Sequence, residues 1–239
     1  MKACRGMSYW NMLSPEELSA IEGYFASTGQ KPLPEKDILK MGSLVEEQIN
    51  DSIIALRKQD LTLAEDIIAK DDIIDELELN IEEDILKLIA TQQPMAIDLR
   101  RIISGFKIIT DLERMGDNAV DIAKTTLRIG GEPLIKPLID IPRMAEITQN
   151  MVKEALDAYI NENVALAETL AQKDDLVDSL HSQITRELLT YMLEEPKNIK
   201  QGTHLMFISR FLERIADHAT NIGENVIYLV TAERRDLNE

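Results

Sequence analysis

Apolar residues recur every three or four positions over most of this chain, which is the spacing of amphipathic α-helices. In the stretch 38–58 the apolar positions on this spacing are Met41, Leu44, Val45, Ile49, Ile53 and Leu56. Two further helices are predicted over 63–91 and 95–129. Pro94 separates them, because proline disfavours helical geometry in the residue before it. The first half of the chain is therefore expected to form three helices.

The same pattern returns after a boundary rich in glycine and proline at 130–142, and predicts helices over 142–160, 164–194 and 198–233. We therefore expect an all-α fold of two tandem, duplicated three-helix bundles, with six main helices and a short irregular N-terminal extension. The expected boundaries are an extension at 1–36, a first repeat at 37–130, a linker at 131–142 and a second repeat at 143–239.

The duplication is visible at the level of single residues. Without gaps, 63–85 and 166–188 are identical at nine of 23 positions, and 106–123 and 206–223 at seven of 18. Both alignments place a proline at the same junction, between the second and third helices. The repeat is therefore one of structure and not only of composition.

Acidic residues recur in register on two helices of each repeat. On the third helices the stripes lie at i, i+4 and i+8, and consist of Glu113, Asp117 and Asp121 in the first repeat and Glu213, Asp217 and Asn221 in the second. On the second helices they lie at i, i+4 and i+7, and consist of Asp71, Asp75 and Glu78, then Asp174, Asp178 and His181. This spacing places each set on one face of its helix, so two acidic faces per bundle can meet.

Carboxylates gathered in this way repel one another, so that either some take up protons or a cation neutralises them. Iron, zinc, manganese, magnesium and calcium all accept carboxylate ligands, and His181 or His218 favours iron or zinc in the second repeat. The alternative is a solvated face with local ion pairs, such as Arg114 with Asp117 and Arg214 with Asp217. Because the acids recur in both repeats, a cation site is the favoured interpretation.

Charge and composition restrict the remaining functions. The net charge of −17 excludes the basic surface that nucleic-acid binding needs, and favours cations or basic proteins as partners. Cys4 is the single cysteine, which fits a reducing compartment, and no apolar stretch approaches a membrane span. A cytoplasmic protein is expected. The sequence contains no nucleophile with its base, glycine-rich phosphate loop or Cys/His zinc motif, so an enzyme is not expected.

Four segments together resemble the PhoU family of phosphate-uptake regulators. They are Lys40-Met-Gly-Ser-Leu-Val-Glu-Glu, Asp98-Leu-Arg-Arg, Leu112-Glu-Arg-Met-Gly-Asp-Asn-Ala and Leu212-Glu-Arg-Ile-Ala-Asp-His-Ala-Thr-Asn-Ile. The resemblance covers about 38–233 and implies two three-helix bundles with multinuclear iron or zinc sites at the acidic motifs. The chain departs from the family at its first 36 residues, at Asn221 in place of the acid at Asp121, and at Asn198 in place of Asp98.

The resemblance also implies a regulator, not an enzyme. Such a protein represses the phosphate-starvation response at the inner face of the membrane, between the ATPase of a phosphate ABC transporter and a sensor histidine kinase. A homodimer is compatible with this role. Two other functions are weighed against it: a carboxylate-bridged di-metal oxidase, for which Asp178-x-x-His181 is the nearest motif, and a helical scaffold that binds no metal.

Overall fold

The computed structural model describes residues 34–238, which form seven α-helices, one short 3-10 helix and no strand. The elements are α2 (Glu35–Lys58), α3 (Leu61–Ala69), α4 (Asp72–Gln92), α5 (Ile97–Ile129), α6 (Asp140–Ile160), α7 (Val164–Glu194), η2 (Pro196–Asn198) and α8 (Ile199–Thr231). The expected all-α class is confirmed. Nearly all of the expected N-terminal extension, 1–36, lies outside the described residues.

The helix predicted over 63–91 is wrong as a single element, because the chain turns at Lys70 and Asp71 between α3 and α4. The turn separates two packing surfaces. α3 buries Ala64 and Ile67 in a small cluster against Val120 of α5, whereas α4 packs into the main core. Tertiary contacts therefore override a periodicity that does run unbroken through α7 in the second repeat.

The pattern of buried positions is repeated in the two halves of the chain, as the sequence is. All ten buried positions of α2 have a buried counterpart on α6 at a constant separation: Ile38 matches Ile141, and Met41 matches Met144, each 103 residues later. The same separation relates α3 and α4 to α7, whereas a separation of 100 relates α5 to α8, so that Leu112 matches Leu212. These correspondences identify equivalent positions in the two repeats.

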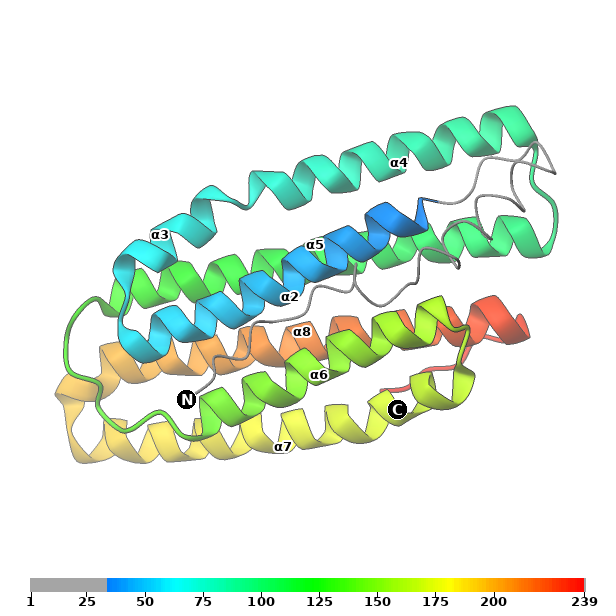
Figure 1. Ribbon diagram of the computed structural model, residues 1–239. Helices are drawn as coiled ribbons and strands as arrows, with labels where there is room; N and C mark the ends of the chain where they lie inside the picture. Colours follow the sequence, from blue (N-terminus) through cyan, green and yellow to red (C-terminus); the bar gives the residue numbers. More distant parts are fainter. Residues whose placement is uncertain (1–33, 239) are drawn as a thin grey trace, which may run out of the picture.

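The two repeats share one hydrophobic core. α5 and α8 run antiparallel through the middle of the molecule and pack against each other, and α2 also packs against α6 (Figure 1). A single cluster of buried apolar residues accordingly runs from Ile38 to Leu229. The α4–α5 turn and the α7–α8 turn lie at opposite ends of the molecule (Figure 1). Within 34–238, no helix is long and apolar enough to cross a membrane.

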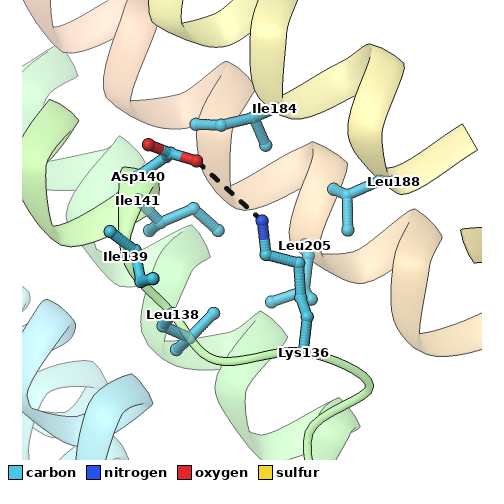
Figure 2. A pocket seen from close by; sticks show the side chains of 8 residues that line it. All are labelled: Lys136, Leu138, Ile139, Asp140, Ile141, Ile184, Leu188 and Leu205. Atoms are coloured by element: carbon cyan, nitrogen blue, oxygen red, sulfur yellow. Dashed lines mark ion pairs between the residues drawn. The ribbon is translucent and has the colours of Figure 1, made fainter. Parts of the chain in front are cut away.

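The connection between the repeats is held at several points. Gln59 Nε2 donates hydrogen bonds to the carbonyl oxygens of Gly130 and Glu132, at 3.3 and 2.6 Å. Gln201 accepts from the backbone N–H of Ile135 at 2.6 Å. Lys136 has a side chain only 8% exposed and pairs with Asp140 at 4.0 Å beside a small, mostly apolar cavity (Figure 2). The connection is therefore held to both repeats by hydrogen bonds and an ion pair.

Candidate metal centres

In the first repeat the structure brings together acids from α4 and α5. We call this group site one; its residues are Asp71, Asp75, Glu78, Glu113 and Asp117. The spacing of i, i+4 and i+7 on the second helix, and of i and i+4 on the third, places each set on one face of its helix. Burial, then the negative charges of Asp117, Glu78 and Asp75, raises the pKa of Glu113 to about 7.

One oxygen of Glu113 has no hydrogen bond. Glu113 Oε2 is buried and accepts none, although Arg114 Nε lies 3.3 Å away. Arg114 also forms the expected local ion pair with Asp117, at 3.3 Å. Site one therefore has two parts. The Asp117 side chain is 47% exposed and lies on a solvated face, whereas Glu113 is largely buried and one of its oxygens has no hydrogen-bond partner.

In the second repeat α7 and α8 bring together an equivalent group. We call it site two; its residues are Asp174, Asp178, His181, Glu213 and Asp217. Burial raises the pKa of Asp174 and of Glu213 to about 7, in both cases with a further contribution from the charge of Asp217. Four carboxylates thus act on one another across two helices.

Site two is the more deeply buried of the two. Asp174 is 6% and Glu213 is 8% exposed, and Asp174 Oδ1 and Glu213 Oε2 have no hydrogen-bond partner. Arg210 pairs with the other oxygen of Glu213. Within the described residues, the ion pair expected between Arg214 and Asp217 does not form. A buried carboxylate oxygen without a donor is costly, so these oxygens are unusual features of a folded protein.

Two of the expected ligands lie outside the sites. Asp121 faces Lys124, at 3.8 Å, and none of the shifted pKa values in site one has Asp121 as a cause. Asn221 donates a hydrogen bond to Asp111 of α5, at 3.2 Å, and so belongs to the contact between the repeats. The reason is helix geometry, since eight residues advance the direction by about 80° and turn the last position of each stripe away.

The structure adds two residues that the sequence prediction missed. Gln48 of α2 donates to Asp71 Oδ1 at 3.4 Å, and Ser209 of α8 lies 3.0 Å from His181 Nδ1. Gln48 is 7% exposed and Ser209 is fully buried. A signal for Gln48 exists in the sequence: it is a polar residue in the apolar register between Val45 and Ile49. Ser209 is likewise a polar residue that directly follows the apolar residue Ile208.

The residues fit a cation by their chemistry but are not arranged around one. Among residues 34–238, no three His, Cys, Asp or Glu side chains are arranged so that they could hold a metal ion. Both sites nevertheless contain a buried carboxylate oxygen without a hydrogen bond. Such oxygens suit hard and borderline cations. Small side-chain rotations that bring the carboxylates together are favourable only when a positive charge offsets their repulsion.

A duplicated three-helix unit, with an acidic group between its second and third helices, defines a class of all-helical tandem-repeat proteins with two related sites. The chain belongs to the PhoU domain family, whose domain matches it twice, at residues 38–126 and 141–226. The resemblance seen in the four sequence segments is thereby confirmed.

Relatives and solved structures agree with this assignment. The chain is 46% identical over 204 residues to a "Phosphate-specific transport system accessory protein PhoU homolog" of Clostridium acetobutylicum, covering 85% of this chain and 93% of that protein. A homolog of the same name from Aquifex aeolicus is also 46% identical, over 83% of this chain and 90% of that protein. The crystal structure of PhoU from Pseudomonas aeruginosa superimposes with a TM-score of 0.80 at 41% identity, covering 83% and 95% of the two chains.

Proposed function

We propose that this protein is a cation-binding regulatory accessory protein of a phosphate-specific transport system, and not an enzyme. Membership of the PhoU family supports the accessory role, because relatives that match the chain over most of their length carry that name. The acidic surface, with a net charge of −17, suits basic protein partners.

The main support for cation binding is that two buried carboxylate oxygens in site two have no hydrogen-bond partner. Asp174 Oδ1 and Glu213 Oε2 come from facing helices and have no hydrogen-bond donor. A bound cation supplies the positive charge that these groups lack, and lowers their pKa values so that all four carboxylates ionise. Site one is proposed to act in the same way through Glu113 and Asp71. Iron and zinc are the favoured ions, and manganese, magnesium and calcium fit the oxygen donors as well.

The metal content of purified protein tests this proposal. We expect chelator-free protein to contain iron, zinc or manganese, and Asp117→Ala and Asp217→Ala each to lose metal. Asp121→Ala is the matched control, because it removes a carboxylate from the same helix, α5, but outside site one. Equal metal content in all four proteins would refute cation binding at these sites.

Metal should also stabilise the fold by mass action. At a concentration 100 times the dissociation constant, a ligand that binds only the folded state adds about 2.7 kcal/mol to the free energy of unfolding. The melting temperature of chelated protein should therefore rise on addition of Zn²⁺ or Mn²⁺. An unchanged melting temperature at saturating metal contradicts the proposal.

The partners proposed for this regulator are the ATPase of the phosphate ABC transporter and a sensor histidine kinase. Contact with them places the protein at the inner face of the membrane. A deletion strain tests the role: at high phosphate we expect increased phosphate uptake and expression of starvation genes. Unchanged uptake and expression contradict the regulatory function, and a failure of the purified ATPase and kinase to bind the chain removes the proposed partners.

A further inference from the structure

The chain after α8 folds back onto the second repeat. α8 ends at Thr231, and Ala232 has the left-handed conformation, with a φ of 64°, that turns the backbone away from the helix axis. Residues 232–238, which we call the tail, then run beside α7 and α8 (Figure 1). Among these described residues, Leu237 alone is partly buried and the others are exposed. The tail is therefore an irregular segment that lies on the surface of the second repeat.

The tail contacts both helices through its last residues. Arg235 Nη1 pairs with Glu168 Oε1 of α7 at 2.6 Å. The backbone N–H of Leu237 donates to Glu224 Oε1 of α8 at 2.9 Å. The Leu237 side chain packs against the main core next to Gly223, where a Cβ would lie 3.3 Å from Leu237 Cδ1. We call Glu168, Gly223 and Glu224 the tail seat.

The tail seat recognises a short chemical pattern. The Glu168 carboxylate selects a basic side chain, and the missing side chain at Gly223 leaves room for a leucine two residues later. Glu224 accepts the backbone N–H of that leucine. The residue before the ion pair also contributes, because Arg234 Cζ lies 5.5 Å from the centre of the Tyr228 ring. The pattern is Arg-x-Leu in a non-helical segment, and its basic residues complement a chain whose net charge is −17.

The attachment of the tail is weak. The Arg235 and Glu168 side chains are 48% and 46% exposed, and ion pairs at such exposure contribute little and are screened by salt. Each tail residue also loses conformational entropy when it is held in one conformation. One partly buried leucine and one hydrogen bond to a carboxylate oppose that loss. A second segment with the same pattern can therefore replace the tail.

Among the described residues, the first repeat has no equivalent of this seat. A separation of 100 pairs Gly223 with Ala123 and Glu224 with Lys124. Ala123 is fully buried in the small cluster against α3. Lys124 repels a basic segment and pairs with Asp121, at 3.8 Å. The tail seat is therefore not part of the duplicated scaffold but a property of the second repeat.

From these contacts we propose that the tail seat is a docking site for an Arg-x-Leu segment of a partner protein, and that the chain's own tail occupies it as a competing, autoinhibitory ligand. The proposal rests on the proposed function only in that the chain acts by binding partner proteins. It does not depend on cation binding at site one or site two.

Peptide binding tests the seat. The probe is a fluorescein-labelled, amidated peptide with the sequence of residues 232–238, and the full-length double variant Arg235→Ala/Leu237→Ala serves as the open variant. We expect the open variant to bind the peptide saturably, and wild type to bind it about 10-fold or more weakly, because a tethered tail competes at a high effective concentration. Asn238→Ala, which keeps the three contacts, is the matched control and should behave as wild type. No binding to the open variant, or equal affinity for wild type, overturns the proposal.

A charge exchange separates direct recognition from damage to the fold. In the open variant, Glu168→Arg should abolish binding of the peptide, and a peptide that carries Arg235→Glu should restore it. Glu65→Arg, at the equivalent position of the first repeat, should leave the affinity unchanged. If the exchanged pair does not bind, the ion pair is not part of recognition and the proposal is wrong.

Partner binding distinguishes this inference from the proposed function. Titration of the purified ATPase and kinase should show that the partner that uses the seat binds the open variant more tightly than wild type and is displaced by the free peptide. If the partners bind both chains equally and the peptide does not compete, the inference fails while the proposed function stands. If neither binds either chain, the proposed partners fail, and the peptide titration still decides whether the seat recognises Arg-x-Leu. Dimers of wild type that are lost in the open variant would show that a second copy's tail is the occupant, which overturns a partner protein.

Discussion

Glu213 combines two properties that rarely occur together in a carboxylate side chain. It is 8% exposed, and one of its oxygens has no hydrogen-bond partner. Burial, followed by the charge of Asp217, raises its pKa from 4.5 to about 7. The folded chain therefore holds this proton more tightly than the unfolded chain does. Ionisation of Glu213 destabilises the fold increasingly as the pH rises from about 4.5 through about 7.

The amide variant Glu213→Gln removes this effect. In metal-free protein we expect Glu213→Gln to be more stable than wild type by about 1 to 2 kcal/mol at pH 8, and not at pH 4, since the neighbouring carboxylates share part of the shift. Chemical denaturation at both pH values measures the difference. The exposed Glu76→Gln is the control and should be neutral at both. A Glu213→Gln variant that is less stable at pH 8 contradicts the role of burial.

The sequence predicted part of each site. The register of Asp71, Asp75, Glu113 and Asp117 follows from helical spacing alone, and so does that of their counterparts in the second repeat. The last position of each third-helix stripe lies apart from the other acids, because Asp121 contacts Lys124 and Asn221 contacts Asp111. Contacts across three helices, such as those of Gln48, depend on the angle at which helices pack, which a single helical period does not specify.

At the scale of elements, periodicity located all six predicted helices, with ends within about three residues of those observed. The break at Lys70 was missed, since nothing in the local sequence is a strong helix breaker there. The ends agree well where a capping residue or proline stops the helix. Asp60 and Asn163 are equivalent examples: each accepts a hydrogen bond at 3.1 Å from a backbone N–H in the first turn of the next helix.

These two caps should contribute similarly to stability. We expect Asp60→Ala and Asn163→Ala each to lower the free energy of unfolding by about 1 kcal/mol, because each leaves a helix N-terminal N–H without its acceptor. The double variant should lose about the sum, since the caps belong to different repeats. Urea denaturation measures all three. Replacement by serine, which can also cap, should recover most of the loss, and equal losses in the serine variants contradict the capping role.

Gly42 marks a close approach of α2 to α6. A Cβ at this position lies 2.5 Å from Leu156 Cδ1, and Leu156 is 1% exposed. We expect Gly42→Ala to destabilise the protein by about 1 to 2 kcal/mol, because crowding exceeds the gain in helix propensity. Thermal unfolding measures the loss. The additional change Leu156→Val should recover part of it, and Gly131→Ala, with no atom within 4 Å, should have little effect.

At the scale of the whole molecule, the two repeats are joined by α5 and α8. Leu112 and Leu212 belong to one cluster of buried residues, and Asp111 of α5 accepts hydrogen bonds from His218 and Asn221 of α8. The calorimetric and van't Hoff enthalpies of unfolding should therefore agree, as they do for one cooperative unit. Two resolved calorimetric transitions contradict a shared core.

The shared core and the matching burial of α2 and α6 together have a consequence for how the two sites could come to differ. Two identical three-helix chains packed in this way would form a symmetric pair, and every substitution in one site would appear in the other. Joining the halves through the fastened 131–139 connection removes that constraint. One copy can then acquire an imidazole and a hydroxyl while its twin keeps an amide and a carboxylate, so covalent fusion is what allows a symmetric scaffold to carry two chemically different groups of side chains.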